Sequence, residues 1–88
     1  MTLRVPRTFP VDQYCLGNRL RITDPGQTGD DDYDFDATLI QIKTEASSFF
    51  LTLGDVTSRG DTLVRETDTI FLSPREVRLV SGYAPVRA

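Results

Sequence analysis

Short segments that alternate apolar and polar residues, with turn signals between them, constrain the fold of this 88-residue chain most strongly. Over residues 16–23, Leu16, Leu20 and Ile22 share one parity, and Arg19 and Arg21 take the other, as in a half-buried strand with a cationic outer face. No window keeps the apolar period of 3.6 residues that marks an amphipathic helix. The sequence therefore predicts one all-β domain of several short strands.

The segment 33–44 changes parity within a single apolar pattern. Phe35, Ala37 and Leu39 fall on one side, whereas Ile40 and Ile42 fall on the other. A strand that switches sides in this way contains a bulge or a sharp bend. The pattern predicts a strong bend in this strand.

Further strands are expected at 48–53, at 63–72 with an interruption at 67–68, and at 77–80, with turns at 24–26, 45–47, 54–55 and 58–61. Ser73 can cap a single helical turn over 73–76, and Pro74 suits its first position. The inward parity of these strands predicts a core of Leu20, Ile22, Ala37, Leu39, Phe49, Leu51, Leu53, Ile70, Leu72, Val77 and Leu79.

The sequence predicts an N-terminal arm, one domain and a C-terminal tail. Pro6 and Pro10 favour an extended N-terminal arm over residues 1–13, followed by the domain at 14–82 and a tail at 83–88. The arm is followed by no apolar stretch of the kind that a signal peptide needs, and no apolar run is long enough for a membrane helix. We expect a cytoplasmic protein without a membrane partner.

The order of the elements resembles that of the SH3-like small β-barrel: strand, long polar loop, bent strand, hairpin, strand, short helical turn and last strand. The resemblance covers about residues 16–80 and is clearest in the closing segment, residues 70–80. It implies a five-stranded barrel with a 3₁₀ turn before the last strand. The chain has no Trp, and Glu76 stands where an aromatic residue of the terminal turn is expected, so binding of proline-rich peptides does not carry over. KOW, Tudor and Sm-like barrels share the architecture and bind different ligands.

The composition removes most catalytic chemistry. There is no His, and Cys15 is the single Cys, so the chain offers neither an internal disulfide nor a Cys/His zinc site. No imidazole is present to activate Cys15, which is expected to be a small core residue. The sequence predicts a protein that is not an enzyme and binds no cofactor.

Charge is segregated along the chain. Residues 1–21 carry a net charge of +3, residues 22–73 carry −8 and residues 74–88 carry +2, which sum to −3. Two basic ends around an acidic middle can bring copies of the chain together, so a homo-oligomer is one expectation.

The acidic run at 30–36 has three interpretations besides a solvated loop. Asp30, Asp32 and Asp34 match the first ligand positions of an EF-hand, but Phe35 and Gln41 break the match, leaving only a weak calcium site. The run can also bind an arginine-rich partner, or imitate the phosphates of a nucleic acid.

The leading hypothesis is a non-enzymatic protein–protein interaction module, either an accessory or assembly subunit or a small inhibitor. It acts on another protein, or on its own copies, through the acidic loop 24–36, the turn 55–61 and the N-terminal arm, where Val11 is a further apolar anchor. The residues expected to bind the partner are Arg4, Arg7, Phe9, Asp30, Asp31, Asp32, Tyr33, Asp34, Phe35 and Phe50.

The alternative hypothesis is a nucleic-acid-binding barrel of the Sm or KOW type. Its arginine face would combine the first and last strands of the barrel, which are often neighbours, and would consist of Arg19, Arg21, Arg75 and Arg78. The ordinary interpretation of these residues is that they face solvent and pair with acids. The tripeptide 59–61 spells Arg-Gly-Asp and is expected to be a hairpin turn, not an adhesion motif.

Overall fold

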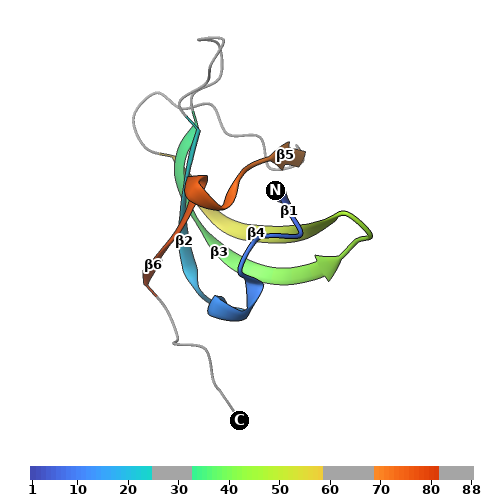
Figure 1. Cartoon of the computed structure of the whole chain (residues 1–88). Helices are drawn as coiled ribbons and strands as arrows, with labels where there is room; N and C mark the ends of the chain where they lie inside the picture. The colour runs from blue at the N-terminus through green and yellow to red at the C-terminus, as the bar shows by residue number, and fades with distance from the viewer. Residues whose placement is uncertain (25–32, 59–68, 82–88) are drawn as a thin grey trace.

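Six strands form one curved sheet in the computed structural model, which describes residues 1–24, 33–58 and 69–81 (Figure 1). The strand order across the sheet is β5-β1-β4-β3-β2-β6. The elements are β1 (Thr2–Pro6), the 3₁₀ helix η1 (Val11–Gln13), β2 (Arg19–Asp24), β3 (Tyr33–Thr44), β4 (Ser48–Ser58), β5 (Thr69–Phe71), the 3₁₀ helix η2 (Pro74–Glu76) and β6 (Val77–Ser81).

The predicted all-β class is confirmed, but the predicted number of strands is wrong. The described residues form six strands in one open sheet with β5 and β6 at its edges, where five strands in a barrel were expected. The sixth strand is β1, within the segment predicted to be an arm.

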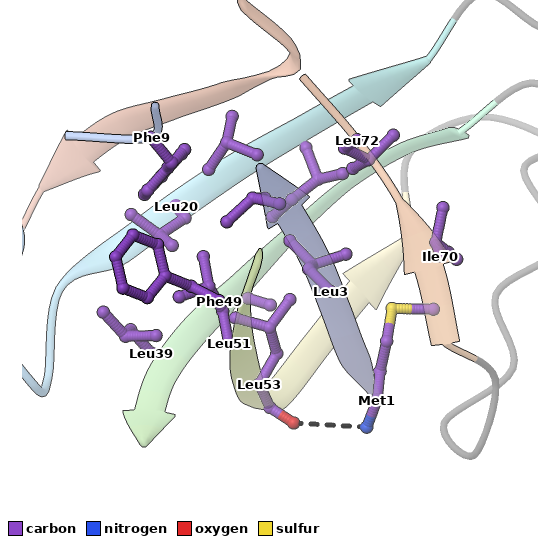
Figure 2. Packing of buried hydrophobic residues seen from close by; sticks show 14 of the residues in the cluster. Met1, Leu3, Phe9, Leu20, Leu39, Phe49, Leu51, Leu53, Ile70 and Leu72 are labelled. Atoms are coloured by element: carbon purple, nitrogen blue, oxygen red, sulfur yellow. Dashed lines mark hydrogen bonds between the residues drawn. The ribbon is translucent and has the colours of Figure 1, made fainter. Parts of the chain in front are cut away.

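Strand β1 is an interior strand of the sheet. It pairs antiparallel with β4 and parallel with β5, and its Leu3 and Val5 side chains are fully buried. The backbone N–H of Leu53 donates to the carbonyl of Met1 over 2.8 Å, and the nitrogen of Met1 lies 3.4 Å from the carbonyl of Leu53 (Figure 2). The segment is extended, as the prolines favour, but it belongs to the domain because its alternating apolar residues complete the core.

Two bulges bend the long hairpin of β3 and β4. In β3, Ile40 is an extra residue between the pairs Leu39↔Leu53 and Gln41↔Thr52, and this irregularity confirms the bulge or bend predicted from the change of parity.

The second bulge lies in β4, between the pairs Thr38↔Gly54 and Asp36↔Thr57. The turn predicted at 54–55 is therefore wrong, because β4 continues to Ser58. Gly and Asp are common in turns because they accept unusual backbone angles, and here Asp55 has φ of 50° at the bulge.

A tight turn precedes β2, which begins at Arg19 and not at residue 16. Gly17 has φ of 95° and donates its N–H to the carbonyl of Leu39 over 2.8 Å. The side-chain oxygen of the buried Asn18 accepts the N–H of Cys15 over 2.6 Å. Leu16, which shares the parity of Leu20 and Ile22 in the sequence, is 58% exposed because this turn directs it outward.

The core lies on the inner face of the curved sheet (Figure 2). Ten of the eleven predicted core residues are buried, and the exception is Leu79, which is 47% exposed on the edge strand β6. The buried apolar residues that were not in the predicted core are Met1, Leu3, Val5, Phe9 and Phe35.

The predicted helical turn is confirmed as η2, with Ser73 at its N-cap and Pro74 first. The carboxylate of Glu76 accepts the backbone N–H of Ser73 over 2.7 Å. This turn brings the chain back to β2, where β6 pairs antiparallel. The predicted strand at 63–66, the residues 59–61 and the tail at 83–88 lie outside the described residues.

Candidate functional surface

Four side chains form a row on the outer face of the sheet, the face opposite the core. The register aligns Lys43 of β3 with Phe50 of β4, Phe50 with Arg4 of β1, and Arg4 with Phe71 of β5. Each of Arg4, Phe50 and Phe71 lies between two buried residues of its strand, so the alternation of the strand turns it outward. We call Arg4, Lys43, Phe50 and Phe71 the basic-aromatic patch.

Arg4 lies between the two aromatic rings of this patch. Its guanidinium carbon is 6.0 Å from the ring centroid of Phe50 and 5.5 Å from that of Phe71. Its Nε donates to the hydroxyl of the buried Ser48 over 3.1 Å. Each exposed cation–π contact stabilises by about 0.5–1 kcal/mol. Together with this hydrogen bond, the contacts hold an exposed arginine in one place on the sheet.

The next row of the same face is neutral. It aligns Gln41, Thr52, Thr2 and Thr69 across the same four strands. None of the eight residues in these two rows is acidic, although the chain has more acidic than basic residues and a net charge of −3. This part of the outer face is therefore positively charged, and it combines aromatic surface with neutral hydrogen-bonding groups.

Arg7 adds a cation in the turn after β1. Its guanidinium carbon lies 4.9 Å from the ring centroid of Phe49, and its Nη1 donates to the carbonyl of Glu45 over 3.2 Å. The side chain is exposed, so its charge remains accessible to a partner.

The structure brings together only some of the residues predicted to bind a protein. Arg4 and Phe50 are neighbours in the basic-aromatic patch. Phe9 and Phe35 are wrong as partner contacts, because Phe9 is 3% exposed and Phe35 is fully buried in the core. Val11 is partly buried and packs against the same core.

The predicted acidic loop falls mostly outside the described residues, which include neither Asp30, Asp31 nor Asp32. The backbone of Tyr33 begins β3, opposite Asp24. Asp34 is described, and its carboxylate pairs with Arg21. Within the described ranges, no group of three or more His, Cys, Asp or Glu residues is arranged to hold a metal ion.

The four arginines of the predicted nucleic-acid face do not act as one group. Arg21 and Arg78 lie directly opposite each other on β2 and β6, as expected for neighbouring first and last strands. Arg19 turns toward β3 and β4, where it donates to Thr38, Thr57 and the carbonyl of Asp55. Arg75 is exposed on η2.

Two further polar side chains lie near the core. Tyr14 stacks on Phe9 with a centroid separation of 5.0 Å, and its hydroxyl donates to the carbonyl of Val77 over 3.3 Å. Burial raises the pKa of Tyr14 above its usual value of 10.0. Cys15, expected in the core, is only partly buried.

Lys43 and Phe71 are the two patch residues that were not predicted from the sequence. Phe71 is the more informative of the two. It is 59% exposed, and it was passed over because it stands in an apolar run, between Ile70 and Leu72. The alternation of the run is the signal that could have placed it on the outer face, since both of its neighbours are buried.

Comparison with protein families, curated proteins and solved structures finds no match to this chain. None of the helices in the described part of the chain is long and apolar enough to span a membrane.

Proposed function

We propose that this chain is a non-enzymatic protein-binding module, and that its basic-aromatic patch binds an acidic surface of another protein. The observation that carries the proposal is the position of Arg4 between Phe50 and the exposed Phe71. Aromatic residues and arginine are enriched in protein interfaces, and arginine is prominent among the residues that dominate binding energy.

The charge of the patch argues for the chemistry of the partner. Arg4 and Lys43 are exposed, and the two outer rows contain no carboxylate to neutralise them. A partner that places acidic side chains here gains electrostatic complementarity, which speeds association and selects against basic surfaces. Apolar side chains of the partner would cover Phe71.

The same geometry argues against nucleic acid as the ligand of this patch. Bases stack on open aromatic faces, whereas the guanidinium of Arg4 already lies over both rings. Arg19, which was expected to contact phosphates, uses its guanidinium group within the sheet.

We also propose that the domain is of the SH3-like kind. The succession β2, β3, β4, β5, η2 and β6, with β6 returning to pair with β2, supports this assignment. The insertion of β1 between β4 and β5 is a departure from the expected five strands. In this proposal, β1 contributes Arg4 and thereby helps to build the binding surface.

Site-specific photo-cross-linking in the native host tests the proposed function. A photoreactive benzoylphenylalanine replaces Phe71 in one variant and Leu16 in a matched control, because these side chains are 59% and 58% exposed. We expect position 71, but not position 16, to cross-link to one acidic protein, and we expect Arg4→Ala to abolish that product.

The chemistry of the cross-linked product decides between the alternatives. A product sensitive to nuclease would replace the proposal by nucleic-acid binding, and a product of two copies of this chain would identify a homo-oligomer instead. Equal cross-linking from positions 71 and 16 would contradict a dedicated patch.

A further inference from the structure

A small hollow lies at the β2–β6 edge of the sheet, away from the basic-aromatic patch. It has a volume of about 240 Å³ and is lined by Arg21, Thr23 and Arg78. Arg21 and Arg78 are directly opposite each other in the antiparallel register of β2 and β6. Two cations and one hydroxyl group therefore face the same space.

Arg21 and Arg78 carry like charges on neighbouring strands. Like charges directly opposite each other on neighbouring strands destabilise a sheet. Within residues 1–24, 33–58 and 69–81, no carboxylate forms an ion pair with the exposed Arg78. An anion between the two guanidinium groups would remove this repulsion.

The acids near Arg21 lie on its other side. Asp34 of β3 takes the edge of the guanidinium formed by Nε and Nη2, at 3.2 and 3.3 Å. Asp36 is also on β3, directly across from Arg21. Because β3 and β6 flank β2 on opposite sides, Asp34 contacts Arg21 from the side of β3, opposite to Arg78 on β6.

We propose that this hollow binds the phosphate group of a small ligand. Arginine pairs with phosphate through charge-assisted hydrogen bonds, and a phosphate in the hollow would lie between the guanidinium groups of Arg21 and Arg78. The hydroxyl of Thr23 supplies a further donor. The hollow is smaller than the roughly 300–1,000 Å³ of sites for drug-sized molecules, so it suits a small anionic group.

Titration with inorganic phosphate, followed by nuclear magnetic resonance of the arginine side chains, tests this site. Chloride keeps the ionic strength constant. We expect saturable shifts of the Nε–H signals of Arg21 and Arg78, because the surroundings of both guanidinium groups change when the anion binds. Shifts that do not saturate, or that spread equally over all arginines, would overturn the proposal.

Two variants locate the ligand. Arg78→Ala is expected to weaken phosphate binding at least ~10-fold, the equivalent of losing one charge-assisted contact. Arg75→Ala is the matched control, because it removes the same charge from a nearby exposed position outside the hollow, and it should change affinity less than ~2-fold. Equal losses in the two variants would show a diffuse charge effect and overturn the site.

Asp34→Asn tests whether Asp34 and the ligand contact different edges of the Arg21 guanidinium group. The substitution keeps an oxygen acceptor for the guanidinium and removes a negative charge, so we expect tighter phosphate binding by ~2-fold or more. Weaker binding would contradict the placement of ligand and carboxylate on different edges of Arg21.

A second set of titrations identifies the source of the phosphate. A nucleoside monophosphate represents a small ligand, and a single-stranded oligonucleotide represents a nucleic-acid backbone. The proposal expects the monophosphate to bind at least as tightly as inorganic phosphate, with the same loss in Arg78→Ala. Binding by the oligonucleotide alone would overturn the assignment to a small ligand.

Discussion

Arg19 donates a hydrogen bond of 2.6 Å from its Nη1 to the carbonyl oxygen of Asp55, the residue whose φ of 50° marks the bulge in β4. The same guanidinium group donates to the hydroxyls of Thr38 and Thr57, at 3.0 and 2.9 Å. These three contacts connect β2 to both strands of the bent hairpin. Arg19 therefore braces the point at which the sheet curves.

Replacing Arg19 should lower the free energy of unfolding more than replacing the exposed Arg75 does. Each of its hydrogen bonds contributes about 0.5–1.5 kcal/mol, and because part of the group is exposed we expect Arg19→Ala to lose about 1–3 kcal/mol in all. Arg75→Ala, at an exposed position on η2, should stay within ~0.5 kcal/mol of the wild type. Urea unfolding of both variants measures the difference, and equal stabilities would contradict the bracing role.

The positive φ of Asp55 predicts that this position tolerates glycine better than a β-branched residue. A β-branched residue at positive φ is strained by about 1–3 kcal/mol, so Asp55→Val should destabilise the protein by that amount. Asp55→Gly should change the free energy of unfolding by less than ~1 kcal/mol, because glycine adopts this conformation freely. If the two variants unfold at the same urea concentration, the backbone at residue 55 is not left-handed.

The burial of Leu3 in β1 predicts that Leu3→Ala lowers the free energy of unfolding more than Leu79→Ala does. Leu3 is fully buried, so Leu3→Ala should cost about 2–5 kcal/mol, through lost burial and the cavity that remains. Leu79 is 47% exposed, and the same substitution there should cost less than ~1 kcal/mol. A mild Leu3→Ala variant in thermal or urea unfolding would mean that residues 1–6 do not belong to the core.

Tyr14 predicts how stability changes at alkaline pH. Burial favours its neutral form and raises its pKa above 10.0 in the folded protein, so the folded state holds this proton more tightly than the unfolded state. The resulting stability is fully present below pH 10 and is lost as the pH rises through the folded pKa.

The variant Tyr14→Phe isolates this effect. It lacks the hydrogen bond to Val77 and should be slightly less stable than the wild type at pH 7. The difference should shrink as the pH rises above 10, because only the wild type then has a phenol to ionise. A constant difference between pH 8 and pH 11 in urea unfolding would contradict the shifted pKa.

The features that depend on residues close together in the sequence could be predicted. The alternation within single strands located ten of the core residues, and the parity change at Ile40 located a bulge. The Ser-Pro pair at 73–74 located η2, because proline suits the first turn of a helix.

Long-range pairing explains most of what the sequence did not reveal. Nothing near residues 2–6 indicates that this segment lies between β4 and β5, since its partners are 42 or more positions away. The Gly-Asp pair at 54–55 suits a turn and a bulge equally well, and only the pairing with β3 decides between them. Leu79 has an inward parity but belongs to an edge strand, where the core no longer covers it.

The candidate surface depends on the same pairing. Arg4, Phe50 and Phe71 come from three distant segments, and they form a patch only because β1 joins β4 to β5. Arg4 and Phe50 could be predicted individually as contacts, whereas their proximity could not.

The most direct test of the proposed function is the affinity of the cross-linked partner for two matched variants, Phe71→Ala and Leu16→Ala, measured by calorimetry. An aromatic residue that dominates an interface contributes ~2 kcal/mol or more, so Phe71→Ala should weaken binding ~30-fold or more. Leu16→Ala should leave the affinity unchanged within ~2-fold. Equal affinities for the two variants would contradict the claim that the basic-aromatic patch is the binding surface.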